Sequence, residues 1–167
     1  VDQLEEVAHA GFPLVSRLSR ARIALVNTCG FIQDAVEESI ETVLDLVERK
    51  RRGDLDRIVV AGCFVQRYGY KLRREIPEVD AWLGPGMIHR IAEVMRAGVS
   101  DDPWFLIDRP RYLADDRAPR RVSGTPFSTY LKIAEGCSHG CAFCTIPSLR
   151  GPLRSRTLSS LLREARR

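Results

Sequence analysis

Residues 22–63, RIALVNTCGFIQDAVEESIETVLDLVERKRRGDLDRIVVAGC, decide the fold class of this chain. Both ends of the stretch, at 22–28 and 57–61, are nearly continuous apolar runs, which are typical of buried parallel strands. Over 31–52, apolar residues recur every three or four positions, which predicts an amphipathic helix. A strand, a helix and a second strand of these lengths predict a βαβ unit with parallel strands.

The same alternation extends on both sides of this unit. We expect further strands at 12–16 and 80–83, and helices over 1–10, 65–75 and 87–98. The chain is therefore predicted to be an α/β protein with a parallel sheet in its first hundred residues.

Beyond residue 100 the pattern changes. Pro, Asp and Arg replace the apolar alternation up to residue 128, a fresh strand is expected at 130–134, and Thr157 is placed to cap a helix that follows it. We accordingly divide the chain into a sheet domain at 1–102, a linker at 103–128 and the start of a second domain at 129–167.

Composition excludes several classes of protein. The chain has 167 residues, of which 44% are hydrophobic and 29% charged, so an intrinsically disordered chain is not expected. No apolar run approaches the roughly 20 residues that span a bilayer, and no secretory leader is evident. We expect a cytoplasmic protein with no membrane partner.

Three of the five cysteines stand close together in EGCSHGCAFC, residues 135–144. Cys137, Cys141 and Cys144 form a C-x3-C-x2-C triplet, and three thiolates on one loop can hold three irons of a 4Fe-4S cluster while the fourth iron stays open. The alternative is a structural zinc site, which requires four ligands. His139 could complete such a site or be an exposed loop histidine.

The other two cysteines follow predicted strands. Cys29 comes after 22–28 and Cys63 after 57–61, and the carboxyl ends of parallel strands lie on one rim of a sheet. The two thiols can therefore converge, although each taken alone could be a small core residue.

The triplet, with Phe143 directly before its last cysteine, resembles the signature of radical S-adenosylmethionine enzymes. In that family the open iron binds S-adenosylmethionine, which is cleaved to a 5'-deoxyadenosyl radical. The resemblance implies that Phe143 lies near the adenine, while an apolar residue that packs the loop is the alternative. No catalytic residue is assigned.

The phrases around Cys29 and Cys63 resemble the amino-terminal domain of the methylthiotransferases within that family. A second 4Fe-4S cluster is held there by one cysteine after each of three strands, and Cys29 and Cys63 match the second and third ligands. The first ligand has no counterpart. We therefore expect a chain truncated at both ends, with an incomplete flavodoxin-like sheet lacking its interior first strand, followed by the first strand and helix of a radical S-adenosylmethionine (β/α) barrel.

Three phrases carry the resemblance to the branch that modifies a protein: VNTCGFIQDAVEESIETV (26–43), REIPEVDAWLG (74–84) and YLKIAEGCSHGCAFCTIPSLRGPLRSR (130–156). The resemblance implies a transferase with two 4Fe-4S clusters and S-adenosylmethionine. Its substrate would be small-subunit ribosomal protein twelve, which receives a methylthio group on the β-carbon of an aspartate. Contact with RNA is possible through the ribosome or a missing C-terminal domain, and the electron and sulfur donors are unnamed. The fragment alone is expected to be inactive.

Two alternatives stay open. The sister branch modifies an adenosine of transfer RNA, and a non-catalytic module could hold zinc in the triplet and bind a partner through arginines. We expect Arg150, Arg154 and Arg156, which follow the triplet, to form an exposed, solvated face.

Overall fold

A computed structural model of the chain describes residues 11–15, 17–98, 102–118 and 127–167. Its centre is a parallel sheet of four strands in the order β1-β2-β3-β4. The strands are β1 (Ile23–Thr28), β2 (Arg57–Gly62), β3 (Ala81–Leu83) and β4 (Trp104–Leu106). The predicted α/β class with a parallel sheet is thereby confirmed.

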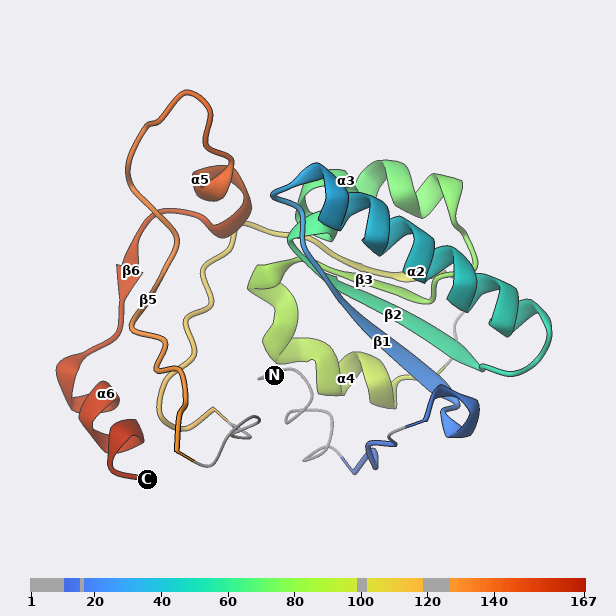
Figure 1. Ribbon diagram of the computed structural model, residues 1–167, viewed down its shortest axis with the longest axis horizontal. Coiled ribbons are helices and arrows are strands. Elements are labelled where there is room, and N and C mark those ends of the chain that lie inside the picture. The colour runs from blue at the N-terminus through green and yellow to red at the C-terminus, as the bar shows by residue number, and fades with distance from the viewer. Residues whose placement is uncertain (1–10, 16, 99–101, 119–126) are drawn as a thin grey trace.

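Helices cover both faces of the sheet (Figure 1). Helices α2 (Gln33–Arg51) and α3 (Cys63–Glu75) pack on one face, and the 3-10 helix η2 (Pro85–Arg90) with α4 (Ile91–Arg96) packs on the other. Side chains of β2 alternate between these two layers, because successive residues of a strand point to opposite faces. Ile58 and Val60 join the first core and Val59 and Ala61 the second.

The beginning of the chain differs from the prediction. Residues 11–15 form no strand, so the strand predicted over 12–16 is wrong there, and a short 3-10 helix, η1 (Leu18–Arg20), leads into β1 instead. Residue 16 and the predicted helix over 1–10 lie outside the described residues. Strands β1 and β2 pair directly, from Ile23↔Arg57 to Thr28↔Gly62, and the expectation that the sheet lacks an interior first strand stays a prediction.

The predicted linker contributes a strand to the sheet. β4 pairs with β3 in parallel, from Ala81↔Trp104 to Leu83↔Leu106, although 103–128 was expected to hold no strand. A run of three apolar residues is too short to show a period, and its conformation depends on the open edge of β3 that it meets. The division of the chain into domains stays a prediction.

The described residues after 127 form small elements. Strands β5 (Ala134–Glu135) and β6 (Arg154–Ser155) make an antiparallel pair, and helices α5 (Ile146–Arg150) and α6 (Leu158–Ala165) follow β5 and β6 respectively. The strand predicted over 130–134 is thus limited to its last residue and Glu135. Thr157 caps α6 as predicted, because its hydroxyl accepts a hydrogen bond from the Ser160 N–H. A (β/α) barrel at 129–167 stays a prediction.

Within the part of the chain that the structure describes, no helix has the length and apolar character that a membrane span requires.

Candidate functional site

Cys29 and Cys63 lie side by side at the carboxyl edge of the sheet. The register pairs Thr28 with Gly62, so each cysteine is the next residue after a paired strand position. Cys63 is also the first residue of α3, two residues before the predicted start of that helix. The structure therefore brings the two thiols to one rim, as the strand pattern predicted.

Two glycines allow this close approach. A Cβ at Gly30 would come within 2.7 Å of the Cys63 carbonyl carbon and the Phe64 nitrogen. Gly62 has φ +117°, a backbone conformation that L side chains rarely adopt, and a Cβ there would collide with the Thr28 carbonyl oxygen. The N-T-C-G and A-G-C sequence segments thus have a structural reason. Each cysteine is next to a glycine at the point where the backbones after β1 and β2 come close together.

The Cys63 thiol is buried and has a charged partner. Its residue is 1% exposed, and the Arg150 Nε donates a hydrogen bond to its Sγ over 2.9 Å. Burial raises the pKa of Cys63, because a thiolate is poorly solvated there, while the Arg150 charge and hydrogen bond oppose that rise. The nearby Cys29 and Glu135 add to the rise in the pKa. The Cys63 sulfur is therefore shielded from solvent, and Arg150 is the group that stabilises its thiolate form.

Arg150 has a second acceptor. Its Nη1 donates to the Glu135 Oε1 over 3.1 Å, and Lys132 forms an ion pair with the same carboxylate. Burial alone would raise the pKa of Glu135, but hydrogen bonds and charges from Lys132 and Arg150 lower it overall. The sequence analysis did not identify this cluster of Lys132, Glu135 and Arg150, although the acidic and basic residues on either side of the cysteine triplet were a signal for it.

The cysteine triplet lies on the loop between β5 and α5, which extends away from the sheet (Figure 1). Cys141 is exposed, Cys137 and Cys144 are half-buried, and all three are free thiols. The Cys137 N–H donates to the Gly151 carbonyl and the Cys144 N–H to the Cys141 carbonyl, both over 3.1 Å. The first of these bonds ties the start of the loop to the end of α5, and the second forms a turn within the loop.

Three soft thiolates on one loop have the donor chemistry that an iron–sulfur cluster requires. The described residues contain no group of three or more His, Cys, Asp or Glu side chains arranged to hold a metal ion. Ligand roles for Cys29, Cys63, Cys137, Cys141 and Cys144 therefore stay predictions that rest on donor type and spacing.

Two other residues of this loop are exposed. Phe143 is 91% exposed, so the alternative that it packs the loop is wrong, and a contact with adenine stays a prediction. His139 is exposed, as one of its two interpretations expected.

The predicted exposed arginine face is wrong, because Arg150 and Arg154 are half-buried and Arg156 is buried. Arg156 is buried, and its guanidinium donates to the Lys132 carbonyl and to the Ser160 hydroxyl. Arg150 is half-buried against Cys63 and Glu135. These side chains find internal acceptors, because a buried guanidinium without partners would be costly.

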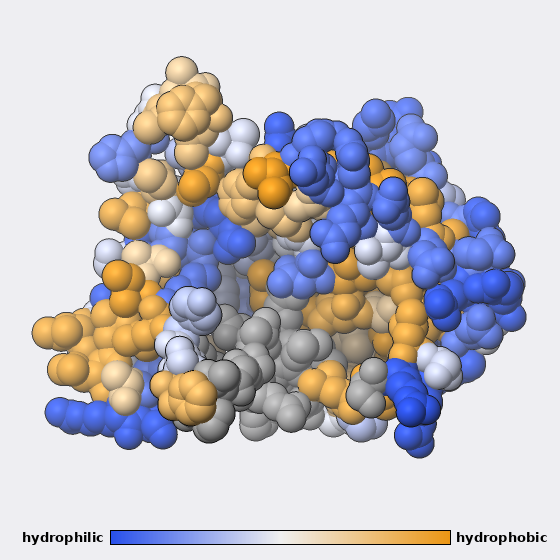
Figure 2. All heavy atoms as spheres, in the orientation of Figure 1, coloured by the Kyte–Doolittle hydropathy of each residue, from blue (hydrophilic) through white to orange (hydrophobic). Residues whose placement is uncertain are grey.

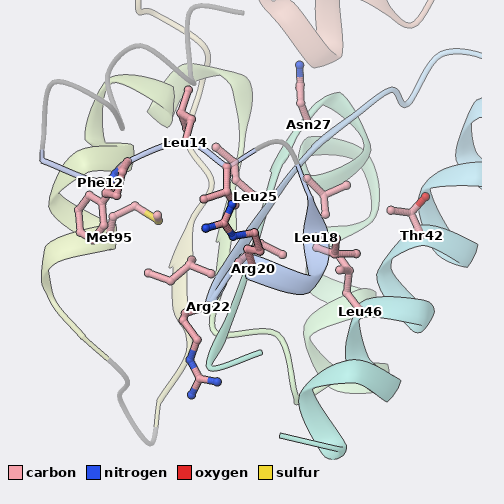
Figure 3. A pocket seen from close by; sticks show the side chains of 16 residues that line it. Phe12, Leu14, Leu18, Arg20, Arg22, Leu25, Asn27, Thr42, Leu46 and Met95 are labelled. Carbon is pink, nitrogen blue, oxygen red and sulfur yellow. The ribbon is translucent and has the colours of Figure 1, made fainter. Parts of the chain in front are cut away.

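An apolar cavity of about 660 Å³ lies beside β1 (Figure 3). Its walls come from the chain before β1, from β1 itself, and from α2 and α4, and they include Phe12, Leu18, Leu46 and Met95. None of the five cysteines lines it, so this cavity is separate from the cysteine site. A different apolar surface lies over the C-terminal segment (Figure 2), where α6 exposes Leu158 and Leu162.

Comparisons with known proteins give the family of the chain. Residues 2–84 match the family model described as "Uncharacterized protein family UPF0004". Three relatives carry the name "Ribosomal protein uS12 methylthiotransferase RimO". The protein of Syntrophotalea carbinolica is 46% identical over 93% of this chain and 34% of the relative. That of Geotalea uraniireducens is 48% identical over 87% of this chain and 33% of the relative, and that of Geobacter sulfurreducens is 44% identical over 98% and 37%.

The chain is an α/β protein with a cysteine after each of two neighbouring parallel strands and a cysteine triplet further along, a pattern that resembles the radical S-adenosylmethionine class. The chain belongs to the methylthiotransferase family that these relatives named RimO represent. It spans about one third of the length of the curated relatives that it matches.

Proposed function

We propose that this chain is part of an enzyme that transfers a methylthio group to ribosomal protein uS12, on the β-carbon of an aspartate. One observation carries the proposal. The triplet segment and the Cys29–Cys63 rim contact each other through Arg150, in a chain 46% identical to a protein named as a uS12 methylthiotransferase.

Different residues of this chain would have different roles in this function. Cys137, Cys141 and Cys144 would hold one iron–sulfur cluster and Cys29 and Cys63 would contribute ligands to another, with Phe143 offering an aromatic surface to adenine. When bound, the clusters and S-adenosylmethionine supply radical chemistry and sulfur transfer. The sheet, whose strand β2 is buried along its whole length, fixes the rim on which Cys29 and Cys63 lie. A cytoplasmic location, where ribosomal protein is available as a substrate, belongs with the same proposal.

Metal analysis tests the ligand assignment. The purified chain is reconstituted anaerobically with iron and sulfide, and iron, sulfide and zinc are measured beside a visible spectrum. We expect about four irons and four sulfides at the triplet, and their loss in a Cys137→Ala, Cys141→Ala, Cys144→Ala variant. The matched control is Cys29→Ala, Cys63→Ala, which leaves the triplet intact. Zinc without iron in the folded chain would overturn the assignment and favour a structural zinc module.

Substrate mass spectrometry tests the activity. Ribosomal protein uS12 and transfer RNA are incubated separately with a protein of the relatives' full length that carries this sequence, and each is searched for the mass gain of a methylthio group. A gain on uS12 that fragmentation places on an aspartate supports the proposal, whereas a gain on transfer RNA alone refutes it. Because the chain spans about one third of its relatives, we expect no turnover by this chain alone, and measurable transfer would contradict that expectation.

A further inference from the structure

Arg150 connects the two cysteine sites in space. It is the last residue of α5, the helix that begins two residues after Cys144, and its Nε donates to the Sγ of Cys63 at the start of α3. The two partners are 87 residues apart in sequence. A single side chain thus joins the triplet segment to the sheet rim.

The geometry of this contact suits an arginine. The Nε and Nη1 groups of the guanidinium lie on one rigid plane, and here they reach two different acceptors, the Cys63 sulfur and the Glu135 carboxylate. Glu135 is in β5, directly before the Gly136-Cys137 turn, so both ends of the triplet loop are tied to the same guanidinium. A lysine carries one nitrogen and cannot present this fork.

Packing around the contact supports it. Leu149, the neighbour of Arg150 in α5, is 3% exposed, and α5 packs on both α3 and η2. Further along the chain, the Arg154 guanidinium donates to the Arg150 carbonyl over 3.1 Å. The backbone of Arg150 is therefore held while its side chain bridges the two cysteine sites.

We propose that Arg150 is a positioning residue that holds the loop of Cys137, Cys141 and Cys144 in a fixed relation to the Cys63 sulfur. Its role in catalysis rests on the proposed function. The contact joins side chains of this chain alone, so it can be tested on the metal-free chain and can fail independently of that function.

The test is hydrogen exchange of the reduced, metal-free chain, measured by mass spectrometry on peptides that cover 135–151. Arg150→Met keeps the length of the side chain and removes its donors. We expect exchange in 135–151 to rise about tenfold, the size that corresponds to losing a hydrogen bond to a charged group. Amides of β2 report global unfolding and should be unchanged. Arg150→Lys, which retains the charge but not the fork, should give an intermediate rate.

A double-mutant cycle separates positioning from general stability. Cys63→Ala removes the sulfur acceptor. Residues 135–151 should therefore exchange hardly faster in the double variant Cys63→Ala, Arg150→Met than in Arg150→Met alone. The matched control is Arg90→Met, whose guanidinium pairs with Glu93 on the surface; its effect should simply add to that of Cys63→Ala.

Unchanged exchange in Arg150→Met, or additive effects in the Cys63–Arg150 cycle, would overturn the proposal. If Arg150→Met loses protection in β2 as well, Arg150→Lys is measured in its place. Exchange of 135–151 at the wild-type rate in Arg150→Lys would overturn the proposal. Faster exchange in Arg150→Lys that is confined to 135–151 would support it.

Discussion

The sheet and the C-terminal segment of this protein are stabilised by different interactions. Among the described residues, every buried hydrophobic side chain except Leu149 lies between Ala24 and Met95. The segment 127–167 instead exposes large apolar residues, among them Tyr130, Phe143 and Leu158.

Arginine contacts replace the apolar core in that segment. Arg163 pairs with Asp116, Arg156 with Glu164, and Arg150 with Glu135. Apolar contacts carry no charge, so they neither titrate nor are screened, whereas ion pairs weaken when either partner is neutralised and when salt screens the charges. Apolar packing around the sheet therefore supplies stability, whereas the segment that carries the cysteine triplet is held by polar contacts that pH and salt can change.

The largest effect is expected from a change in the apolar core around the sheet. Trp82→Ala removes a fully buried side chain from the core between the sheet, α2 and α3, so we expect the free energy of unfolding to fall by about 3–5 kcal/mol in a urea titration. The control is Leu158→Ala in α6, where the side chain is 71% exposed; it should change that free energy by less than about 0.5 kcal/mol. Similar losses in both variants would contradict the comparison.

The next effect concerns a buried polar group, Asp80, which lies directly before β3. The buried Asp80 carboxylate accepts hydrogen bonds from the Ile58 N–H over 2.8 Å and from the Lys50 Nζ over 2.6 Å. Asp80→Ala leaves both donors without this acceptor, and we expect a loss of about 2–4 kcal/mol in unfolding free energy. Asp45→Ala removes an exposed i,i+4 pair with Arg49 and should cost only about 0.3–0.5 kcal/mol. A cost for Asp80→Ala no larger than this control would show that the buried pair adds little.

A smaller effect is expected at the start of α6. Thr157→Ala removes the hydroxyl that accepts from the Ser160 N–H, and we expect the last helix to lose about 1 kcal/mol. Hydrogen exchange of α6 amides measures this loss. Thr157→Ser keeps the cap and should behave as the wild type, and faster exchange in that variant would point to lost methyl packing instead.

The smallest effect is the pH dependence of the C-terminal segment. Hydrogen bonds from Arg163, and then from Ser160, hold the pKa of Asp116 well below its usual range. A carboxyl with a lowered folded-state pKa adds stability that is present above its unfolded pKa of about 3.9 and is lost as the pH falls through the folded value. The effect is small because the Arg163 side chain is 55% exposed and is screened by salt.

Asp116→Asn checks this dependence. Thermal unfolding midpoints of the wild type and the variant should differ at pH 6, and the difference should shrink as the pH falls below about 4. Asp54→Asn, at an exposed position, is the control for removing a charge. A difference that persists unchanged at low pH would mean that Asp116 acts through its shape and not through its charge.

Much of the sheet could be predicted because its pattern is local. The run 22–28, the amphipathic period over 31–52 and the run 57–61 correspond to β1, α2 and β2 with small shifts at their ends. The meeting of Cys29 and Cys63 followed from parallel pairing. Strand β4 could not be predicted, because three residues show no period and the open edge of β3 decides their conformation.

The sequence by itself determined the α/β class, the spacing of the cysteine triplet and the resemblance to methylthiotransferases, since each can be recognised from residue types and their order along the chain, without knowing which segments pack together. Only the tertiary structure decided that Arg150 and Arg156 turn inward and that Arg150 reaches a sulfur 87 residues away. The physical reason is that a buried guanidinium must find acceptors, and which acceptors lie within reach depends on how the packed elements are placed.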